Sequence, residues 1–367
     1  MESNRRESNR TEGRGAGLRV VVVGATGNVG TSLMRALGQE QAVGSTLGLA
    51  RRPCRLSIAK AAWACVDVAD PQDNLESHFR GADAVVHLAW LFQPTHDPAT
   101  TWETNVLGSL RVFDAVARSG VPALIHASSV GAYSPGPKDR YVDESWPTHG
   151  WPEAAYCREK AYLERVLDAF EERHPDIRVV RMRPGFLFKR EAASEQRRLI
   201  AGPLVPQRLV RPSLIPIVPD LPDLRFQALH TDDAADAYRR AVVREVRGAF
   251  NLAADPVIDG SRLADLLAAR AVRLPQRPVR DAVAAAWRLH LVPASPELFD
   301  AVLRLPLLDT ARARTELEWT PRYGAVEALD EFLHGLRDMA GMDTAPLAAR
   351  LPGGRLRELA TGVGQRP

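Results

Sequence analysis

The chain has 367 residues, of which 45% are hydrophobic and 25% charged, and its formal net charge is +3. This length favours one large domain or two joined ones, and the hydrophobic content excludes a chain that is disordered throughout. Because the arginines alternate with Asp and Glu instead of gathering in one block, the charge pattern argues against a nucleic-acid-binding protein.

The cysteines and the apolar runs indicate in which cellular compartment the protein is expected. Three cysteines without a CxxC pair are too few for a disulfide framework and fit a reducing environment. No run approaches the ~18 apolar residues that a membrane span needs, and the polar N-terminus lacks the apolar core of a signal peptide. We therefore expect a cytoplasmic protein that has a small-molecule substrate and binds neither membranes nor nucleic acids.

The first half of the chain alternates strand and helix patterns after a polar tail over residues 1–17. Continuous Val and Ile runs predict parallel strands that helices cover on both faces. We therefore predict an α/β fold, a Rossmann-type doubly wound parallel sheet over residues 18–182, to which residues 226–254 return. The strand patterns are "LRVVVVGA", "STLGLA", "WACVDVA", "ADAVVHLAW", "ALIHASS" and "IRVVRMRPG", and helices are expected from Val29, over 102–118 and from about 153 to 171.

The pattern changes after Arg183, where Pro-rich sequence replaces the alternation. We assign residues 183–225 and 255–337 to a smaller, mostly helical substrate-binding domain, and residues 338–367 to a C-terminal tail. A helix start is expected near "LHTDDAADA", with Asp232 or Asp233 near the cap. Further helices are expected near 261–271, 281–290, 310–317 and 324–337.

A glycine-rich turn follows the first strand in "VVVVGATGNVG". A tight turn needs residues without Cβ, and a phosphate reaches the N–H groups at a helix start only where no side chain intervenes. The turn therefore predicts a dinucleotide phosphate site. Its contacts are expected at Gly24, Thr26, Gly27, Asn28, Val29 and Gly30.

The second strand ends at Arg51 and Arg52, where an acidic residue would normally bind the adenosine ribose. Planar guanidinium groups match the 2′-phosphate of NADP, so NADP is favoured over NAD. The alternative is that one or both arginines point to solvent.

A tyrosine and a lysine stand four residues apart in "AAYCREKAYLERVL". On a helix Tyr156 and Lys160 share a face, and a nearby ammonium lowers the pKa of a phenol from about 10 toward the range of a general base. Spacing alone favours an exposed polar face. However, "ALIHASSVGAY" places Ser128 and Ser129 at the end of the fifth strand, where parallel sheets bind ligands.

Together these motifs resemble the extended short-chain dehydrogenase/reductase superfamily, in particular its NAD-dependent epimerase/dehydratase-like branch. "GATGNVG", "DVAD", "HLAW", "TNVLGS", "SSVGAY", "YCREK", "RPG", "LHTDDAADA" and "ELEWTPRY" occur in the family's order over residues 18–337. The resemblance implies that Tyr156 is the general acid or base, and that Lys160 adjusts its pKa and contacts the nicotinamide ribose. Ser129, four residues before Tyr133, would orient the reacting oxygen, with Ser128 as the alternative.

The resemblance also implies further residues of the cofactor site, at the ends of the third, fourth and sixth strands and in the helix after the fourth. Asp67 and Val68 would contact the adenine, and His87, Leu88 and Ala89 would line the cofactor. Asn105 would support the architecture of the site, and Arg183 and Pro184 would meet the nicotinamide through backbone groups.

The same machinery serves reductases, dehydrogenases and epimerases. "RPGFLFKRE" lacks the Asn that sugar-nucleotide epimerases of the family often carry after the sixth strand, and Trp90 replaces a small residue. We therefore favour an NADP-dependent reductase or dehydrogenase of a carbonyl or alcohol with a bulky apolar substrate pocket. Candidate lining residues are Trp90, Leu91, Phe92, Trp146, Trp151, Phe186 and Phe188, of which Trp90 and Phe186, with Ser129, are the expected substrate contacts.

Two alternatives remain open: a nucleotide-sugar epimerase or dehydratase with tightly bound NAD(P), and a regulatory protein that senses NADP without turnover. Arg208, Arg211 and Arg225 are candidate ligands of a phosphorylated substrate, although exposed arginines are the simpler interpretation. The nine histidines form no zinc pattern, so no metal is expected. The helices over 102–118 and 153–171 are candidates for a homodimer interface.

Overall fold

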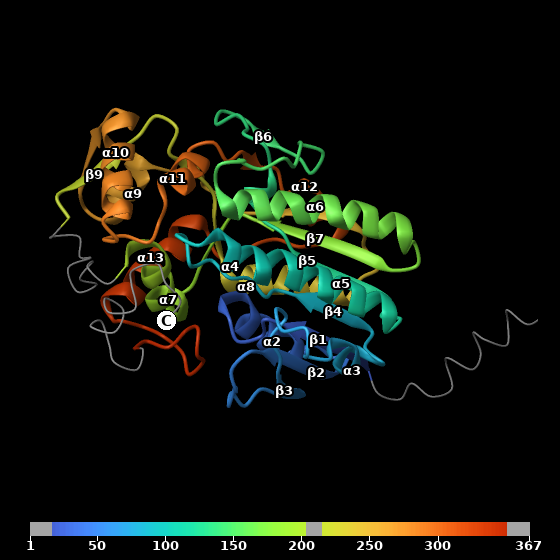
Figure 1. Ribbon diagram of the computed structural model, residues 1–367. Helices are drawn as coiled ribbons and strands as arrows, with labels where there is room; N and C mark the ends of the chain where they lie inside the picture. Colours follow the sequence, from blue (N-terminus) through green and yellow to red (C-terminus); the bar gives the residue numbers. More distant parts are fainter. Residues whose placement is uncertain (1–16, 203–214, 351–367) are drawn as a thin grey trace, which may run out of the picture.

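A seven-stranded parallel sheet forms the centre of the computed structural model, which describes residues 17–202 and 215–350 (Figure 1). Its strand order is β12-β7-β5-β4-β1-β2-β3. The order reverses between β1 and β4, where an open α/β sheet binds its ligands at the carboxyl ends of the strands. The strands are β1 (Leu18–Val23), β2 (Val43–Ala50), β3 (Ala61–Cys65), β4 (Ala84–His87), β5 (Ala123–Ala127), β7 (Arg178–Pro184) and β12 (Gly248–Leu252).

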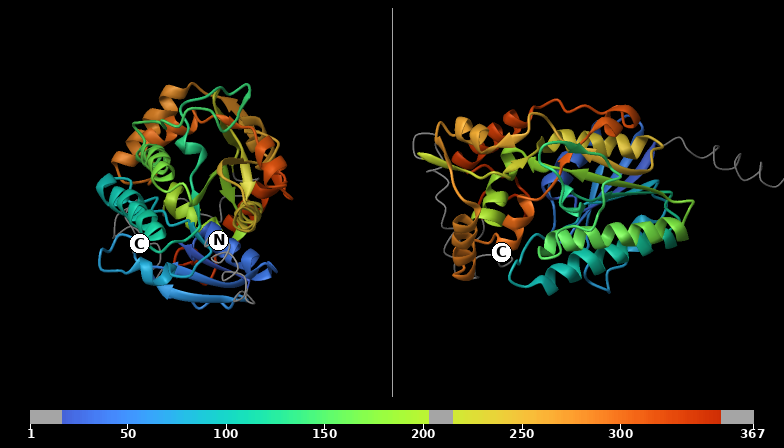
Figure 2. Two further views of the ribbon diagram at one scale, coloured as in Figure 1. Left: turned by 90° about the vertical axis from the view of Figure 1, so that its right-hand side faces the viewer. Right: turned by 90° about the horizontal axis from the view of Figure 1, so that it is seen from above.

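Helices cover both faces of this sheet, as the sequence predicted. On one face α2 (Asn28–Gln39) packs beside α8 (Thr231–Val243). On the other face α5 (Gly108–Arg118) and α6 (Ala155–Arg173) run side by side, next to the short α3 (Leu75–Phe79) (Figure 1, Figure 2).

The continuous apolar run of β1 follows from this double cover. Val20 and Val22 belong to the core cluster under α2 and α8, whereas Val21 and Val23 belong to the cluster under α5 and α6. Because successive side chains of a strand point to opposite faces, a strand covered twice needs an apolar residue at every position.

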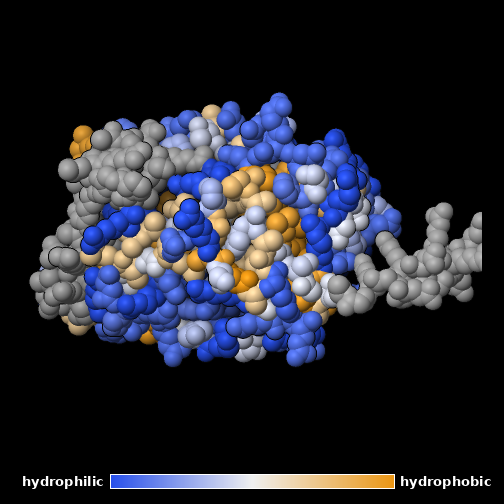
Figure 3. Space-filling model, turned by 90° about the horizontal axis from the view of Figure 1, so that it is seen from below, coloured by the Kyte–Doolittle hydropathy of each residue, from blue (hydrophilic) through white to orange (hydrophobic). Residues whose placement is uncertain are grey.

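The edge strand β3 is less protected. Its five residues are half-buried or exposed and none is charged. Figure 3 shows the molecule from below, which is the side on which β3 lies in Figure 1. Apolar residues gather in the middle of this face, and hydrophilic residues surround them.

A second group of elements projects from one end of the molecule (Figure 1, Figure 2). A helix was expected near 261–271, but α9 ends at Leu266 and Ala268 has a φ of 48°, so the chain turns and β14 begins at Arg270. The sequence also missed α11, although Ser295 caps it and Pro296 opens it. The elements are β9 (Ile217–Asp220), α9 (Gly260–Leu266), β14 (Arg270–Arg273), α10 (Gln276–Arg288) and α11 (Pro296–Val302).

Short elements connect this group to the sheet. None of the described helices is long and apolar enough to cross a membrane. The connecting elements are α4 (Pro98–Trp102), β6 (Tyr141–Val142), β8 (Phe186–Phe188), α7 (Ala193–Gln196), β10 (Arg225–Phe226), β11 (Ala228–His230), β13 (Ile258–Asp259), β15 (Leu307–Leu308), α12 (Ala311–Glu316) and α13 (Ala325–Arg337), with π-helical turns over Glu103–Leu107 and Arg197–Ala201 and 3-10 turns over Val130–Ala132 and Arg190–Ala192.

Two distant motifs meet at the start of α8. His230 caps the helix, since its Nδ1 accepts the N–H of Asp232 at 3.2 Å, and Asp232 and Asp233 lie next to the cap in the first turn, as expected. Asp233 is buried, and its Oδ2 accepts the N–H groups of Arg322 and Tyr323, each at 3.0 Å. Asp233 of "LHTDDAADA" therefore holds "ELEWTPRY" in place.

The segment after α13 is not the free tail that we expected throughout. Residues 339–350 fold back onto the glycine-rich turn, where the Thr344 hydroxyl donates to the carbonyl of Thr26 at 2.9 Å. Leu347 is completely buried. The rest of the expected tail, residues 351–367, and residues 1–16 lie outside the described part of the chain.

Candidate active site

The glycine-rich turn is shaped by two glycines and left open by a third. Gly24 has a φ of 86°, and a Cβ there would lie 2.5 Å from the Ala89 nitrogen. A Cβ on Gly30 would overlap the carbonyl of Gly24. Around Gly27 the nearest atom is 3.6 Å from the Cβ position, so an approaching group meets no side chain at the start of α2.

A cavity of about 210 Å³ lies across this turn. It has the glycines at one wall, two arginines after β2 and an apolar floor, a combination that fits a dinucleotide with a diphosphate and an adenosine. Its lining comprises Gly24, Thr26 and Gly27 of the turn, Arg51 and Arg52, the apolar Val66 and Val68, residues 88–93 after β4, and Glu195, Arg198, Leu199, Ala345 and Pro346 from the C-terminal half.

Tyr156 lies at the start of α6 and donates its hydroxyl to Ser129 Oγ at 2.9 Å. Ser129 Oγ also accepts the N–H of Gly131 at 3.0 Å. A Cβ on Gly131 would stand 2.7 Å from the Tyr156 ring, so the glycine permits this close contact. Burial raises the pKa of Tyr156 to about 12, and the phenol is therefore protonated at neutral pH.

Ser128, the neighbouring serine, takes another direction. Its hydroxyl donates to Glu164 Oε1 at 2.5 Å. Of the two serines, Ser129 is the one that contacts Tyr156.

Lys160 lies one turn after Tyr156, with its side chain buried. Its Nζ donates to the carbonyl of Ala127 at 2.7 Å and stands 3.3 Å from the centroid of the Trp90 ring. Burial lowers the pKa of Lys160 to about 7, although the charges of Glu159 and Glu164 act in the opposite direction. We expected Lys160 to lower the pKa of Tyr156. In this geometry it does not, because its ammonium is directed at Trp90 and Ala127.

A second, smaller cavity of about 40 Å³ adjoins Tyr156. Trp90, Leu91 and Phe92 line both cavities, so this segment separates the dinucleotide cavity from the one beside Tyr156. The Trp90 ring meets the Tyr156 ring edge-on at 5.7 Å. Its buried Nε1 has no hydrogen-bond partner in the described part of the chain, which makes it a donor that a ligand can use. The other lining residues are Pro94, Thr95, Pro98, Thr101, Ala154, Ala155, Glu159, Ser295 and Leu298.

Asn105 supports this wall rather than reaching the dinucleotide cavity. Its Oδ1 accepts the N–H of Leu91 at 2.6 Å and its Nδ2 donates to the Leu91 carbonyl at 2.8 Å. The same Nδ2 donates to Glu159 Oε2 at 2.7 Å, and Glu159 Oε1 accepts the Thr101 hydroxyl at 2.6 Å. The segment after β4 is thereby fixed to α6.

Two other expected cofactor residues turn their side chains away from the cavity. Among the described residues His87 does not line it: His87 is buried, its Nε2 is 2.8 Å from Ser109 Oγ, and burial lowers its pKa to about 3. Asp67 turns its carboxylate to the N–H of Ala69 at 3.1 Å, while its neighbours Val66 and Val68 line the cavity. Pro184, expected to act through its backbone, is the last residue of β7.

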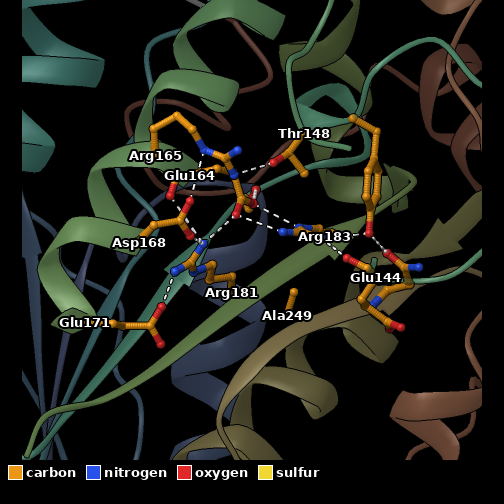
Figure 4. Close-up of polar contacts among 12 residues, drawn as sticks. Glu144, Thr148, Glu164, Arg165, Asp168, Glu171, Arg181, Arg183 and Ala249 are labelled. Atoms are coloured by element: carbon orange, nitrogen blue, oxygen red, sulfur yellow. Dashed lines mark hydrogen bonds and ion pairs between the residues drawn. The ribbon is translucent and has the colours of Figure 1, made fainter. Parts of the chain in front are cut away.

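The side chain of Arg183 is held in a buried ionic network (Figure 4). Its Nε and Nη2 bind both oxygens of Glu164 at 2.9 and 2.8 Å, and its Nη1 donates to Tyr133 Oη at 2.9 Å. Arg181 also donates to Glu164, at 3.0 Å. Burial would raise the pKa of Glu164, but these arginines hold it at about 2.

Four of the seven residues expected around the substrate pack elsewhere. Trp146 and Phe186 join a cluster with Tyr133, Trp151 packs near Cys157, and Phe188 contacts Phe332. Arg208 and Arg211 lie outside the described residues, and Arg225 donates to the carbonyl of Lys138. No group of three metal-ligating side chains occurs within residues 17–202 and 215–350.

Comparison with known proteins finds relatives that match part of the chain. An uncharacterized protein of Mycobacterium tuberculosis is 27% identical over 266 residues, which are 69% of this chain, and the chain spans only 65% of that protein's length. The sterol-4-alpha-carboxylate 3-dehydrogenase (decarboxylating) of Saccharomyces cerevisiae is 32% identical over 109 residues, 29% of this chain and 30% of that enzyme.

Solved structures share the fold. The UDP-glucose 4-epimerase of Thermotoga maritima, in complex with UDP-glucose, has a TM-score of 0.65 at 18% identity and covers 88% of this chain and 99% of its own. MoeE5 in complex with UDP-glucuronic acid and NAD has a TM-score of 0.64 at 19% identity, with 87% and 99% covered. A family model, described as the NAD dependent epimerase/dehydratase family, matches residues 20–253. The chain therefore belongs to the NAD-dependent epimerase/dehydratase family.

Proposed function

We propose that the protein catalyses hydride transfer between NADP(H) and a carbonyl or alcohol substrate, with Tyr156 as the general acid or base. One observation carries the proposal: Tyr156 donates to Ser129 at the wall between a cradle that fits a dinucleotide and an apolar cavity. A reacting oxygen that binds there finds two hydroxyl groups at once.

In the reductive direction Tyr156 gives its proton to the substrate oxygen. The nicotinamide of a bound NADPH would supply the hydride to the carbonyl carbon, and in the reverse direction NADP+ would accept it. Because its pKa is raised to about 12, Tyr156 carries the proton that this direction requires. Ser129 holds the hydroxyl of Tyr156 in position for this transfer. Oxidation of an alcohol would reverse the proton transfer.

The second cavity favours an uncharged, apolar substrate. Among the described residues that line it, Glu159 is the only charged one, and both of its oxygens are bound, by Thr101 and Asn105. A nucleotide sugar would bring a diphosphate, which needs cationic partners. This supports a reductase or dehydrogenase over the nucleotide-sugar epimerase that the matched structures exemplify.

The arginines after β2 support NADP as the cofactor. Arg51 and Arg52 are adjacent and line the cavity. The pKa of Arg51 is lowered by partial burial, and Arg52 acts in the same direction, against Asp67. A 2′-phosphate between two like charges would relieve their repulsion.

A substrate panel tests the proposal. Purified protein is assayed for a change in NADPH absorbance with uncharged aromatic and aliphatic ketones and aldehydes, and for interconversion of UDP-sugars with NAD. Turnover of apolar carbonyl compounds is expected. Turnover of UDP-sugars alone would replace this proposal with the epimerase alternative.

A further inference from the structure

A buried lysine from the C-terminal half reaches the start of α2. Lys189 follows β8 and its side chain is 2% exposed. Its Nζ donates to the carbonyl of Asn28 at 2.7 Å, to Thr31 Oγ1 at 2.8 Å and to Ser32 Oγ at 3.1 Å. The three hydrogen atoms of the ammonium are thus all bound by the first turns of α2.

These hydrogen bonds extend into the glycine-rich turn. Thr31 Oγ1, which accepts from Lys189, lies 3.0 Å from the carbonyl of Gly27 and donates to it. Gly27 is the position where an approaching phosphate meets no side chain. Lys189 therefore acts on the phosphate-binding turn through Thr31, although the two are more than 150 residues apart in the sequence.

The charge of Lys189 needs an explanation, because its hydrogen-bond partners are uncharged and burial disfavours an ammonium. The start of a helix is moreover its positive end. The charged groups that act on Lys189 at longer range are Asp232 at the start of α8, Glu191, Glu195 and, with the opposite effect, Arg35 of α2. An anion at the start of α2 would compensate both the ammonium and the helix dipole.

We infer that Lys189 is a positioning residue of the cofactor site, which shapes the glycine-rich turn through Thr31 and supplies positive charge to the diphosphate of a bound dinucleotide. This role rests on dinucleotide binding at the turn, and it does not depend on the NADP preference or on the reaction catalysed. The proposed role predicts that the affinity for a diphosphate falls when Lys189 loses its proton, an effect that purely structural hydrogen bonds would not produce.

Burial lowers the pKa of Lys189 to about 8. A bound diphosphate favours the ammonium, so the affinity for a diphosphate is complete below about pH 8 and falls as the pH rises above it. The test is isothermal titration calorimetry with ADP, which carries the diphosphate but no nicotinamide. Wild type, Lys189→Arg and Lys189→Met are compared at pH 7.5 and 9.5. The matched control is Arg35→Met, because Arg35 is an exposed cation of α2.

At pH 7.5 we expect Lys189→Met to bind ADP about tenfold more weakly than wild type, with Arg35→Met close to wild type. At pH 9.5 the wild type should approach Lys189→Met, whereas Lys189→Arg, which stays charged, should keep its affinity. Equal affinities of wild type and Lys189→Met at pH 7.5, or the same decline with pH in Lys189→Arg as in wild type, would overturn the inference.

If Lys189→Met does not fold, the comparison of wild type with Lys189→Arg decides. Failure of the wild type to bind ADP at either pH would contradict both this inference and dinucleotide binding at the turn. ADP binding that is insensitive to Lys189 would overturn the inference alone.

Discussion

Two polar regions meet at the carboxyl end of β5, and they differ in how their hydrogen bonds are satisfied. In the Glu164 network, formed by Ser128, Glu164, Arg181, Arg183 and Tyr133, both carboxylate oxygens of Glu164 are bound by arginines (Figure 4). Beside it lies the reaction site.

The reaction site has fewer of its hydrogen bonds satisfied. It is formed by Ser129, Tyr156, Lys160 and Trp90. Its tyrosine donates to a single serine and the indole N–H of Trp90 has no partner among the described residues. Satisfied buried groups stabilise a fold, whereas buried groups with spare capacity are available to a ligand. The two regions should therefore respond differently to mutation, in stability on one side and in activity on the other.

The largest expected effect is on stability, in the Glu164 network. Glu164→Ala leaves Arg183 and Arg181 buried without their central partner, and we expect it to lower the free energy of unfolding by about 3–5 kcal/mol. Urea unfolding followed by circular dichroism measures the loss.

Glu171→Ala is the matched control, since Glu171 binds Arg181 at the edge of the network and is partly exposed. We expect this change to cost about 1 kcal/mol or less. Equal losses in the two variants would show that the network is not the stabilising region.

Substitution of the two adjacent serines distinguishes the roles of the two regions. Ser129→Ala removes the acceptor of Tyr156, and we expect kcat/KM to fall on the order of 100-fold while stability changes little. Ser128→Ala removes a donor from Glu164, and we expect a loss of about 1–3 kcal/mol in stability with activity near wild type. Both variants are measured by steady-state kinetics and by urea unfolding. Loss of activity in Ser128→Ala with none in Ser129→Ala would exchange the assigned roles.

The smallest expected effect concerns the cofactor. Arg51→Ala and Arg52→Ala should each weaken NADPH binding about tenfold and NADH binding much less, because only NADPH carries the 2′-phosphate. Fluorescence titration gives the four affinities, with Arg55→Ala, an exposed arginine that does not line the cavity, as control. Equal affinity of the wild type for the two cofactors would refute the NADP preference.

Much of the fold could be predicted from the sequence because its signals are local. The apolar run of β1 and the glycines that follow it can be interpreted from neighbouring residues alone. The family motifs also singled out Tyr156 and Ser129, which the structure brings within hydrogen-bonding distance.

The parts that were missed depend on contacts between distant segments. Lys189 lies in the stretch 183–225, which the sequence assigned only to the substrate-binding domain, and nothing in the neighbouring residues shows that Lys189 reaches α2. Residues 339–350 have little periodicity, yet they pack on the glycine-rich turn. His87 was expected at the cofactor, together with Leu88 and Ala89, from the family resemblance. Leu88 and Ala89 line the cavity, but the side chain of His87 is buried beside Ser109.

The most direct test of the proposed function is Tyr156→Phe, which removes one oxygen atom and keeps the ring. With the carbonyl substrate that the panel identifies, we expect kcat to fall by at least about 100-fold, because the proton donor is lost. The NADPH affinity, measured by fluorescence titration, should remain nearly unchanged. Turnover at the wild-type rate in Tyr156→Phe would contradict the assignment of Tyr156 as the general acid or base.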